Sequence, residues 1–334
     1  MILGKASIKF DEAPYIQSYA SVVGKKEGEG PLRTEFDEVV EDPMFGGENW
    51  EDAEGRLQAK IAQNTMKKGD LTAENIRYIY AGDLLGQLIA TFFGLKDMNI
   101  PLFGLYGACS TMGEALSLGA MSVAGGFSDC TLCLTSSHFA SAEKTFRFPL
   151  GYGTQRKFSA TWTVTGGGGV ILGKKSSKAR ITGITTGKIV DYGIKDKENM
   201  GACMAPAAAD TIYQHFCDFS SKPEDYDKII TGDLGYIGQT ILIDFMEEKG
   251  YDIKYNHMDC GIEIFNKDAQ DTHAGASGCG CSASVLCSLI LGQITKGIWK
   301  KVLFVPTGAL FSPVTANEGN SIPGIAHAVV IEHS

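Results

Sequence analysis

The sequence predicts an α/β protein, a layered sandwich built from two duplicated βαβ-rich halves. The first observation is an internal repeat, because residues 71–94 and 222–246 follow the same order of features. Each has a polar lead-in, a short apolar strand, Gly-Asp, a turn containing Gly-Gln and an apolar helix. Gly82-Asp83 in the first copy therefore corresponds to Gly232-Asp233 in the second. Self-similarity of this kind indicates duplication of a structural unit.

The second observation is a pair of helices without a polar face, expected at 112–124 and 283–296. Each follows a turn of small residues and precedes another strand, within the corresponding segments 108–137 and 280–308. Alternation of strands and helices favours parallel βαβ pairing. A helix that is apolar all round is buried on every side, so both helices are expected to be covered by sheets.

The repeat divides the chain into an N-terminal half, 1–177, and a C-terminal half, 178–334. An acidic, Gly-rich stretch at about 25–48 is interpreted as an insertion loop of the first half. A longer insertion is expected at 250–273 in the second half. Strands at 166–175 and 324–334 are expected to end the two halves.

Composition narrows the class of protein. The 334 residues carry a net charge of −9, which argues against nucleic acid as the main partner because phosphate binding needs a basic face. The sequence has neither a signal peptide nor an apolar run long enough to cross a membrane. The nine cysteines indicate a reducing compartment, and the Cys130–Cys133 pair lacks the second pair of a zinc site. We therefore expect a cytoplasmic protein without a metal site.

Cys109 is the strongest candidate for chemistry. It follows an expected strand, 100–108, and precedes the first apolar helix, with Ser110 or Thr111 as the helix N-cap. The positive end of the helix would lower the pKa of the thiol, and the free N–H groups there would hold an anion. The turn thus suits a nucleophile or an anion pocket. The alternative is a small buried residue before a core helix.

Three stretches resemble the stage V sporulation protein AD (SpoVAD) family of the thiolase superfamily: "GLYGACSTMGEAL", "SSHFASAEKTFRFPLGYGTQR" and "ATWTVTGGGGVIL". The likeness extends over essentially the whole chain. It implies a five-layer αβαβα fold, a homodimer and a role in endospore formation. It also implies binding of dipicolinic acid (pyridine-2,6-dicarboxylate) and partnership with the SpoVA membrane proteins that take it into the developing spore. The chain would then be peripheral to the forespore or spore inner membrane.

The partners that an enzyme of this superfamily places beside its cysteine are mostly missing. Gly232-Asp233 stands where synthases of the superfamily have a histidine, the turn at 273–284 has no Asn, and the last loop, 306–327, has no Cys. His273 remains a possible base, and His138 and His327 are other histidines near the pocket. Because a nucleophile and its base act as a unit, we expect a degenerate site used for binding. The alternative is an acyltransferase or ketoacyl synthase-like enzyme with Cys109 as the nucleophile.

A dipicolinate site would need N–H donors, cations and an apolar slot for the ring. Asp83 is one of the expected ligand-binding residues because it would meet a calcium ion brought by the ligand. A Gly-Asp after a strand is, however, also a common turn device. Each basic residue has the alternative of a solvated loop charge. Phe146 and Tyr152 are further ring contacts, and Lys144 a further cation. The expected ligand-binding residues are Cys109, Ser110, Asp83, His138, Arg147, Arg156, Trp162, His273 and Gly278.

The homodimer is expected to form through the strand at 129–137, "DCTLCLTSS", which is apolar as a strand continued across a subunit boundary would be. The alternative is a strand buried within one chain.

Overall fold

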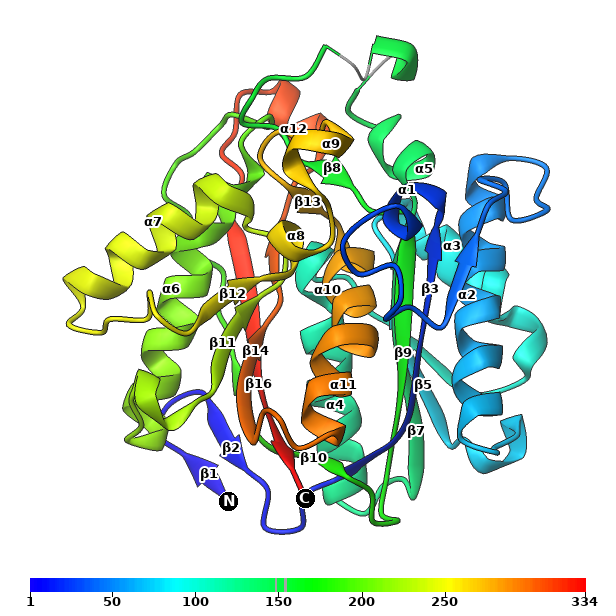
Figure 1. Cartoon of the computed structure of the whole chain (residues 1–334), viewed down its shortest axis with the longest axis vertical. Helices are drawn as coiled ribbons and strands as arrows, with labels where there is room; N and C mark the ends of the chain where they lie inside the picture. Colours follow the sequence, from blue (N-terminus) through cyan, green and yellow to red (C-terminus); the bar gives the residue numbers. More distant parts are fainter. Residues whose placement is uncertain (148, 153–154) are drawn as a thin grey trace.

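This computed structural model describes residues 1–147, 149–152 and 155–334. Its two halves place their corresponding strands in the same order when each half is read from its outer edge inward (Figure 1). The full order is β12-β11-β14-β16-β10-β3-β9-β7-β5-β6. The first five strands in the order belong to the second half and the last five to the first. The strands are β3 (Tyr15–Gly24), β5 (Tyr78–Gly82), β6 (Leu102–Gly104), β7 (Cys130–Ser137), β9 (Gly166–Gly173), β10 (Ala179–Thr186), β11 (Lys228–Thr231), β12 (His257–Asp259), β14 (Lys301–Val305) and β16 (Gly324–His333).

The two halves meet where β3 and β10 come together through one residue pair, Tyr15 and Arg180. On either side of this junction lie five strands of this order, and they form the main part of one sheet. In both groups of five, β5 and its repeat mate β11 are the second strand from the outer edge. The repeat around Gly82-Asp83 and Gly232-Asp233 therefore corresponds to equivalent positions in the fold.

The two apolar helices lie between these two groups of strands, as the sequence predicts (Figure 1). The first, α4 (Thr111–Ala124), contacts β5, β7 and β9 on one side and β16 on the other. The second runs without a break through α10 (Cys279–Val285), a π-helical turn η7 (Leu286–Ile290) and α11 (Leu291–Thr295). It begins a turn earlier than expected. All seven residues of α10 are buried.

Outer helices complete five layers. In the first half α2 (Trp50–Lys68) and α3 (Ile89–Leu95) pack together, and α2 covers β3, β7 and β9. In the second half α6 (Met200–Phe219) and α7 (Gly235–Glu248) pack together, and α6 covers β16. The αβαβα sandwich is therefore confirmed.

Short elements connect these layers and border the site described below. Trp162 and Thr163 form β8, which pairs in parallel with β13 of the other half. The remaining short elements are β1 (Ile2–Leu3), β2 (Ser7–Lys9), β4 (Glu38–Val40), β13 (Ala276–Ser277), β15 (Thr307–Ala309), α1 (Lys25–Gly28), α5 (Phe139–Glu143), α8 (Cys260–Glu263), α9 (Lys267–Gln270) and α12 (Pro313–Asn317).

Both expected insertions contain regular structure. The stretch 25–48 includes α1 and β4, and β4 pairs in parallel with β3. The stretch 250–273 includes β12, which is the outer strand of the second half and the counterpart of β6. The sequence analysis did not expect these short strands, because strands of three residues are too short to show alternation of apolar and polar residues.

The proposed dimer strand also needs correction. β7 lies between β5 and β9, and all eight of its residues are buried within the chain. Its apolar character comes from covering by α2 and α4, so the prediction that it continues across a subunit boundary was wrong. The outer strand of this group is β6, where the side chain of Phe103 is 51% exposed.

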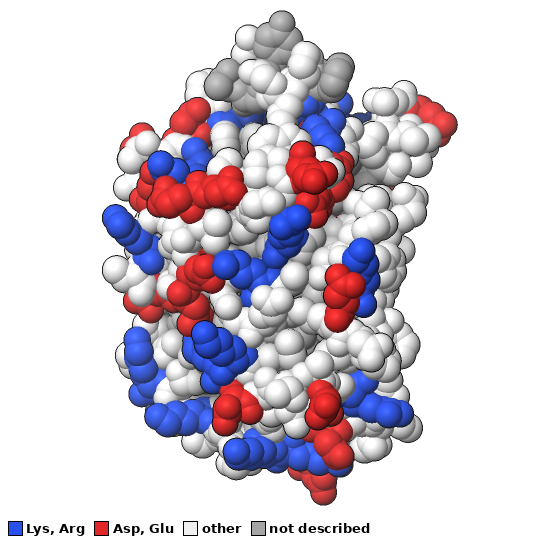
Figure 2. Space-filling view, turned by 90° about the vertical axis from the view of Figure 1, so that its right-hand side faces the viewer, with Lys and Arg blue, Asp and Glu red and all other residues white. Residues whose placement is uncertain are grey.

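The surface over the first half mixes both signs of charge, and Figure 2 shows Lys and Arg interspersed with Asp and Glu on the face that it draws. Among the helices of the described residues, we find none with the length and apolar character needed to span a bilayer.

Candidate functional site

Cys109 lies in a tight turn between β6 and α4, within a short helical turn η4 (Ala108–Ser110). Ala108 has φ of +50°, a left-handed conformation that side chains other than glycine rarely adopt. The Ser110 hydroxyl donates to Gly107 O at 2.7 Å, and the Thr111 hydroxyl donates to Ala108 O at 2.6 Å. These hydroxyls hold the turn. Ser110 stands at the N-cap position of α4, as predicted, but its side chain accepts no hydrogen bond from the helix.

A loop of the second half closes over this turn. In β15, a Cβ added at Gly308 would clash with the backbone O of Gly107 and lie 3.0 Å from the backbone N of Cys109. Only glycine allows this approach of two backbones. The second half therefore forms part of the surroundings of Cys109.

Cys109 lines a cavity of about 470 Å³ between the halves. Most of the wall is apolar or aromatic, and the charged groups Arg147, Lys197 and Glu198 lie together on it. The lining residues are Leu84, Gly86, Tyr106, Ala108, Cys109, Ala142, Thr145, Phe146, Arg147, Ala160, Thr161, Thr163, Lys197, Glu198, Met200, Met204, Ser277, Ala309, Phe311, Ser312 and Pro313.

The surroundings of the Cys109 thiol favour its protonated form. Burial raises its pKa well above the usual value, and the nearby Asp233 carboxyl and Cys279 raise it further. The sequence analysis expected the helix terminus to lower this pKa. Desolvation of the thiolate and the adjacent acid outweigh the helix in the folded chain.

Asp233 is the buried acid beside this thiol. Its Oδ2 accepts from the backbone N of Gly278 at 2.8 Å and from the Ser277 hydroxyl at 3.2 Å. Its Oδ1 has no hydrogen-bond partner within the described residues. Burial raises the pKa of Asp233 to about 7. The candidate Gly278 is thus part of the immediate surroundings of Cys109 through its backbone.

The equivalent acid of the first half, Asp83, is used differently. It is fully buried and accepts from the backbone N of Leu85 at 2.7 Å and from the N and hydroxyl of Thr91 at 2.8 and 2.6 Å. Asp83 therefore holds its own turn and does not line the Cys109 cavity, contrary to its expected place there. Nor do the described parts of the chain contain a cluster of three or more His, Cys, Asp or Glu suited to a metal ion.

Arg147 is the candidate cation that does line the cavity. Its Nε donates to Glu143 at 2.6 Å, and its Nη1 donates to Glu198 at 3.1 Å. Glu143 ends α5, and its other oxygen accepts from the backbone N of Thr163 at 3.2 Å. The arginine is therefore held in one orientation by a carboxylate that is itself fixed.

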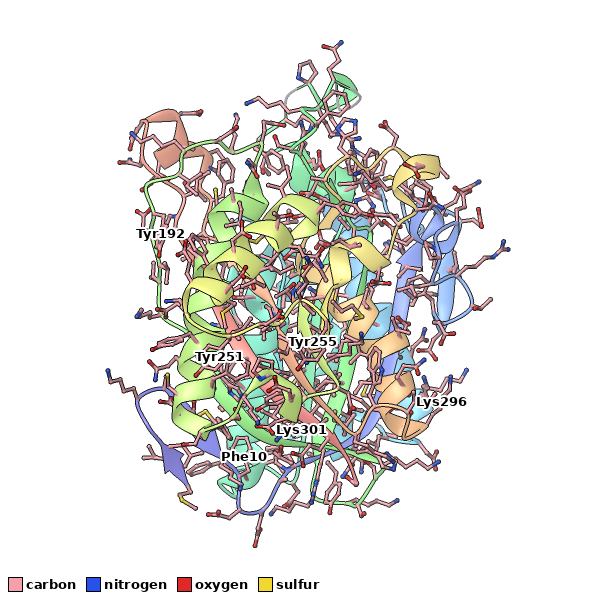
Figure 3. All side chains as sticks on the ribbon, turned by 60° about the vertical axis from the view of Figure 1, so that its left-hand side comes forward. Phe10, Tyr192, Tyr251, Tyr255, Lys296 and Lys301 are labelled. Carbon is pink, nitrogen blue, oxygen red and sulfur yellow. The ribbon has the colours of Figure 1, made fainter. Side chains whose placement is uncertain are left out.

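Glu198 and Lys197 come from the loop before α6. Tyr192 fastens this loop to the outer helix layer, because its ring lies 5.6 Å from that of Phe245 in α7. Figure 3 labels Tyr192 on the outer side of the second half. Sequence reasoning missed both charged residues, although the run "KDKEN" before a helix of alanines is visible in the sequence.

Two other candidates, Trp162 and His138, line a separate cavity of about 300 Å³. Residues along β8 point alternately to its two sides, so Thr161 and Thr163 face the Cys109 cavity while Trp162 faces the second one. Arg156 lies over the Trp162 ring at 4.6 Å and donates to the backbone O of Asp271 at 2.6 Å. The predicted grouping of these side chains with Cys109 was therefore wrong.

The remaining candidates lie apart from Cys109. His273 is not a base for the thiol, because its ring nitrogens contact Lys157 O at 2.8 Å and the Asp271 carboxylate at 3.1 Å. Lys144 pairs with Glu51 at 2.5 Å. Like these residues, His327 and Ser110 do not line the Cys109 cavity. Phe146 does line it, whereas the side chain of Tyr152 is outside the part that the structure describes.

These features define the class of protein. The chain has the fold of thiolase-like condensing enzymes, since 3-oxoacyl-[acyl-carrier-protein] synthase III from Aquifex aeolicus VF5 superposes with a TM-score of 0.54. That pair covers 96% of this chain and 100% of the other at 13% identity. A variant of OleA from Xanthomonas campestris gives a TM-score of 0.58 at 11% identity, with 97% and 99% covered. At such identities the likeness shows the fold alone.

The sequence comparison is more specific. Residues 4–332 match the family of stage V sporulation protein AD (SpoVAD). The chain is 40% identical to stage V sporulation protein AD of Bacillus subtilis (strain 168), over 100% of this chain and 98% of that protein. This chain therefore belongs to the SpoVAD family and to a sporulation system.

Proposed function

We propose that this chain binds dipicolinic acid in the Cys109 cavity, for the SpoVA machinery that takes dipicolinate into the developing spore. The observation that carries the proposal is the composition of the cavity. Aromatic and apolar walls, including Phe146 and Phe311, suit a flat ring, and Arg147 offers a cation to a carboxylate. A cavity of about 470 Å³ is within the usual range for small ligands.

The surroundings of Cys109 favour binding over catalysis. A thiol acts as a nucleophile after a base removes its proton or a positive group stabilises the thiolate. Here the neighbour is Asp233, a carboxyl that raises the pKa of the thiol. The residues lining the cavity include no histidine in the described part of the chain.

The alternative function is acyl transfer with Cys109 as the nucleophile. It is favoured by one observation, that the cysteine lines a cavity in a fold shared with a 3-oxoacyl-[acyl-carrier-protein] synthase III. We prefer the binding function because fold alone does not imply activity.

Calorimetric titration with dipicolinate tests the proposal. We expect saturable binding that Cys109→Trp abolishes by filling the cavity. Cys109→Ala should weaken binding by about 1 kcal/mol or less, as for loss of one neutral contact. Absence of binding to the intact protein would overturn the proposal.

Mass spectrometry after incubation with an acyl-CoA tests the alternative. We expect Cys109 to remain unmodified. A stoichiometric acyl mass on Cys109 that is lost in Cys109→Ala would establish the acyltransferase instead.

The same proposal covers the partners of the protein and its location in the cell. We expect the protein to act at the inner membrane of the forespore or spore, attached peripherally through other SpoVA proteins. High salt or alkali should then release it from spore membranes, and resistance to both would argue for an anchor. We expect calcium only as a companion of the ligand, since Asp83 accepts three hydrogen bonds from its own turn and does not line the Cys109 cavity.

A homodimer remains part of the proposal, with its interface moved to β6. Among the described strands β6 pairs with β5 alone, and its Phe103 and the residue Phe93 of α3 are 51% and 64% exposed. Exposed strand edges with apolar side chains are typical association sites. Light scattering should give the mass of a dimer, and Phe103→Glu should give that of a monomer.

A further inference from the structure

The Arg147–Glu198 ion pair on the wall of the Cys109 cavity is the feature from which we argue. Both residues line the cavity, and their side chains are 11% and 17% exposed. A pair so well shielded from solvent interacts more strongly than one on an open surface.

The two carboxylates on Arg147 have different surroundings. Glu143 is 1% exposed and bonds both Arg147 Nε and the backbone N of Thr163, so it belongs to the framework. Glu198 bonds Arg147 Nη1 at 3.1 Å. A ligand carboxylate that bonds Arg147 through Nη1 would take the position of Glu198.

Glu198 can leave this position without disturbing its loop. Its backbone N donates to Asp196 Oδ1 at 3.0 Å, and Asp196 is in turn paired with Lys157 at 3.2 Å. The backbone is thus held by contacts that do not involve the Glu198 side chain. Rotation of that side chain alone would free Arg147 Nη1, while Nε stays bonded to Glu143.

We propose that Glu198 is an internal carboxylate that the ligand's carboxylate replaces on Arg147. This inference rests on the proposed function and names the residue that sets its selectivity. Replacement exchanges one charge-assisted hydrogen bond for another, so a carboxylate ligand leaves Arg147 paired. A neutral analogue that displaced Glu198 would leave Arg147 Nη1 without a charged acceptor and the arginine paired with Glu143 alone, which disfavours binding of that analogue.

A double-mutant cycle measured by calorimetry with dipicolinate tests this inference. Glu198→Gln should tighten binding roughly threefold to tenfold, because the competing charge on Arg147 is removed. Arg147→Met should weaken binding by about tenfold or more. In the Arg147→Met background, Glu198→Gln should no longer tighten binding.

Asp196→Asn is the matched control, since it removes a negative charge from the same loop and retains an oxygen for the backbone N of Glu198. It should change affinity less than about twofold. Unchanged or weaker binding by Glu198→Gln would overturn the inference while leaving dipicolinate binding in place. An equal gain in affinity from Glu198→Gln in the Arg147→Met background would also overturn the inference. The gain would then come from long-range charge alone. Failure of the unaltered protein to bind would overturn the proposed function as well.

Discussion

At the scale of single residues, the thiol of Cys109 is under two opposing influences. Its place before α4 favours the thiolate, whereas burial and the carboxyl of Asp233 favour the thiol. The second influence is stronger, and the protein holds its cysteine as a neutral side chain of the cavity wall. A cysteine-dependent enzyme needs a base or a positive group that favours the thiolate.

We predict that Asp233→Asn lowers the pKa of Cys109, because a negative neighbour is removed while burial stays. The pH dependence of alkylation at Cys109, followed by peptide mass spectrometry, measures this. The midpoint should move to lower pH than in the unaltered protein. A midpoint that stays in place or rises would show that Asp233 does not control the thiol.

We predict that Arg156→Ala affects stability more than ligand affinity. The side chain is buried, packs on Trp162 and holds the backbone of Asp271. Its loss should lower the free energy of unfolding by about 1–3 kcal/mol. Denaturant unfolding and calorimetry on the same sample separate the two effects. A loss of affinity equal to that of Arg147→Met, with unchanged stability, would return Arg156 to the binding site.

The sequence located only part of the site. The position of Cys109 follows from the strand, turn and apolar helix around it, and Arg147 and Phe146 lie on the cavity wall. The sequence analysis grouped Arg156, Trp162 and His273 with these residues because they lie near them in the sequence or belong to motifs of the same family. Alternation along β8 sends Trp162 to the other side, and that division depends on pairing with β13 of the other half.

At the scale of elements, the glycine-rich strand β9 sets how closely the central helix approaches the strands of the first half. Gly168 faces α10, and a Cβ there would clash with the backbone O of Ala283 and lie 2.7 Å from Cys287 Sγ. The glycines of β9 therefore serve close packing of a helix on a strand. This explains a run of four glycines in a fully buried strand.

We predict that Gly168→Ala lowers the free energy of unfolding by about 1–3 kcal/mol, because the added methyl group forces α10 away from β9. Gly86→Ala is the control, since no atom lies within 4 Å of its added Cβ. Denaturant unfolding of both variants measures the difference. Equal stability of the two would show that α10 can shift at little cost.

The elements that sequence reasoning found are long or strongly patterned. The helices α4 and α10–α11 lack a polar face, and the repeat fixed the equivalence of β5 and β11. The strands β4 and β12 have three residues each, so they form mainly because a neighbouring strand of the sheet pairs with them. The same limit led to the choice of β7 as an interface, because an apolar strand looks alike whether its neighbour is in the same chain or in another.

At the scale of the whole molecule, several carboxyls are buried in the fold. Burial raises the pKa of Glu27 and of Asp233 to about 7 in each case, and raises that of Glu54 beside Asp83. Each group binds its proton more tightly in the folded chain than in the unfolded chain. Between the two pKa values the folded chain carries more protons, so stability falls as pH rises.

We predict that the free energy of unfolding falls by roughly 1–3 kcal/mol between about pH 6.5 and 8.5. The buried histidines His215, His257 and His327 act oppositely, but only at lower pH, since burial lowers the pKa of His215 to about 3 and those of His257 and His327 to about 4. Urea unfolding across this range measures the slope. Asp233→Asn should reduce the slope, and a rise in stability with pH would contradict the account.

A crystal structure of the complex with dipicolinate tests the central claim most directly. The account predicts the ring in the Cys109 cavity against Phe146 and Phe311, with one carboxylate about 3 Å from a nitrogen of Arg147 and Glu198 turned away. Density for the ring in the second cavity, beside Trp162 and Arg156, would contradict it. So would a complex in which Arg147 stays bonded to Glu198 while the ligand lies elsewhere.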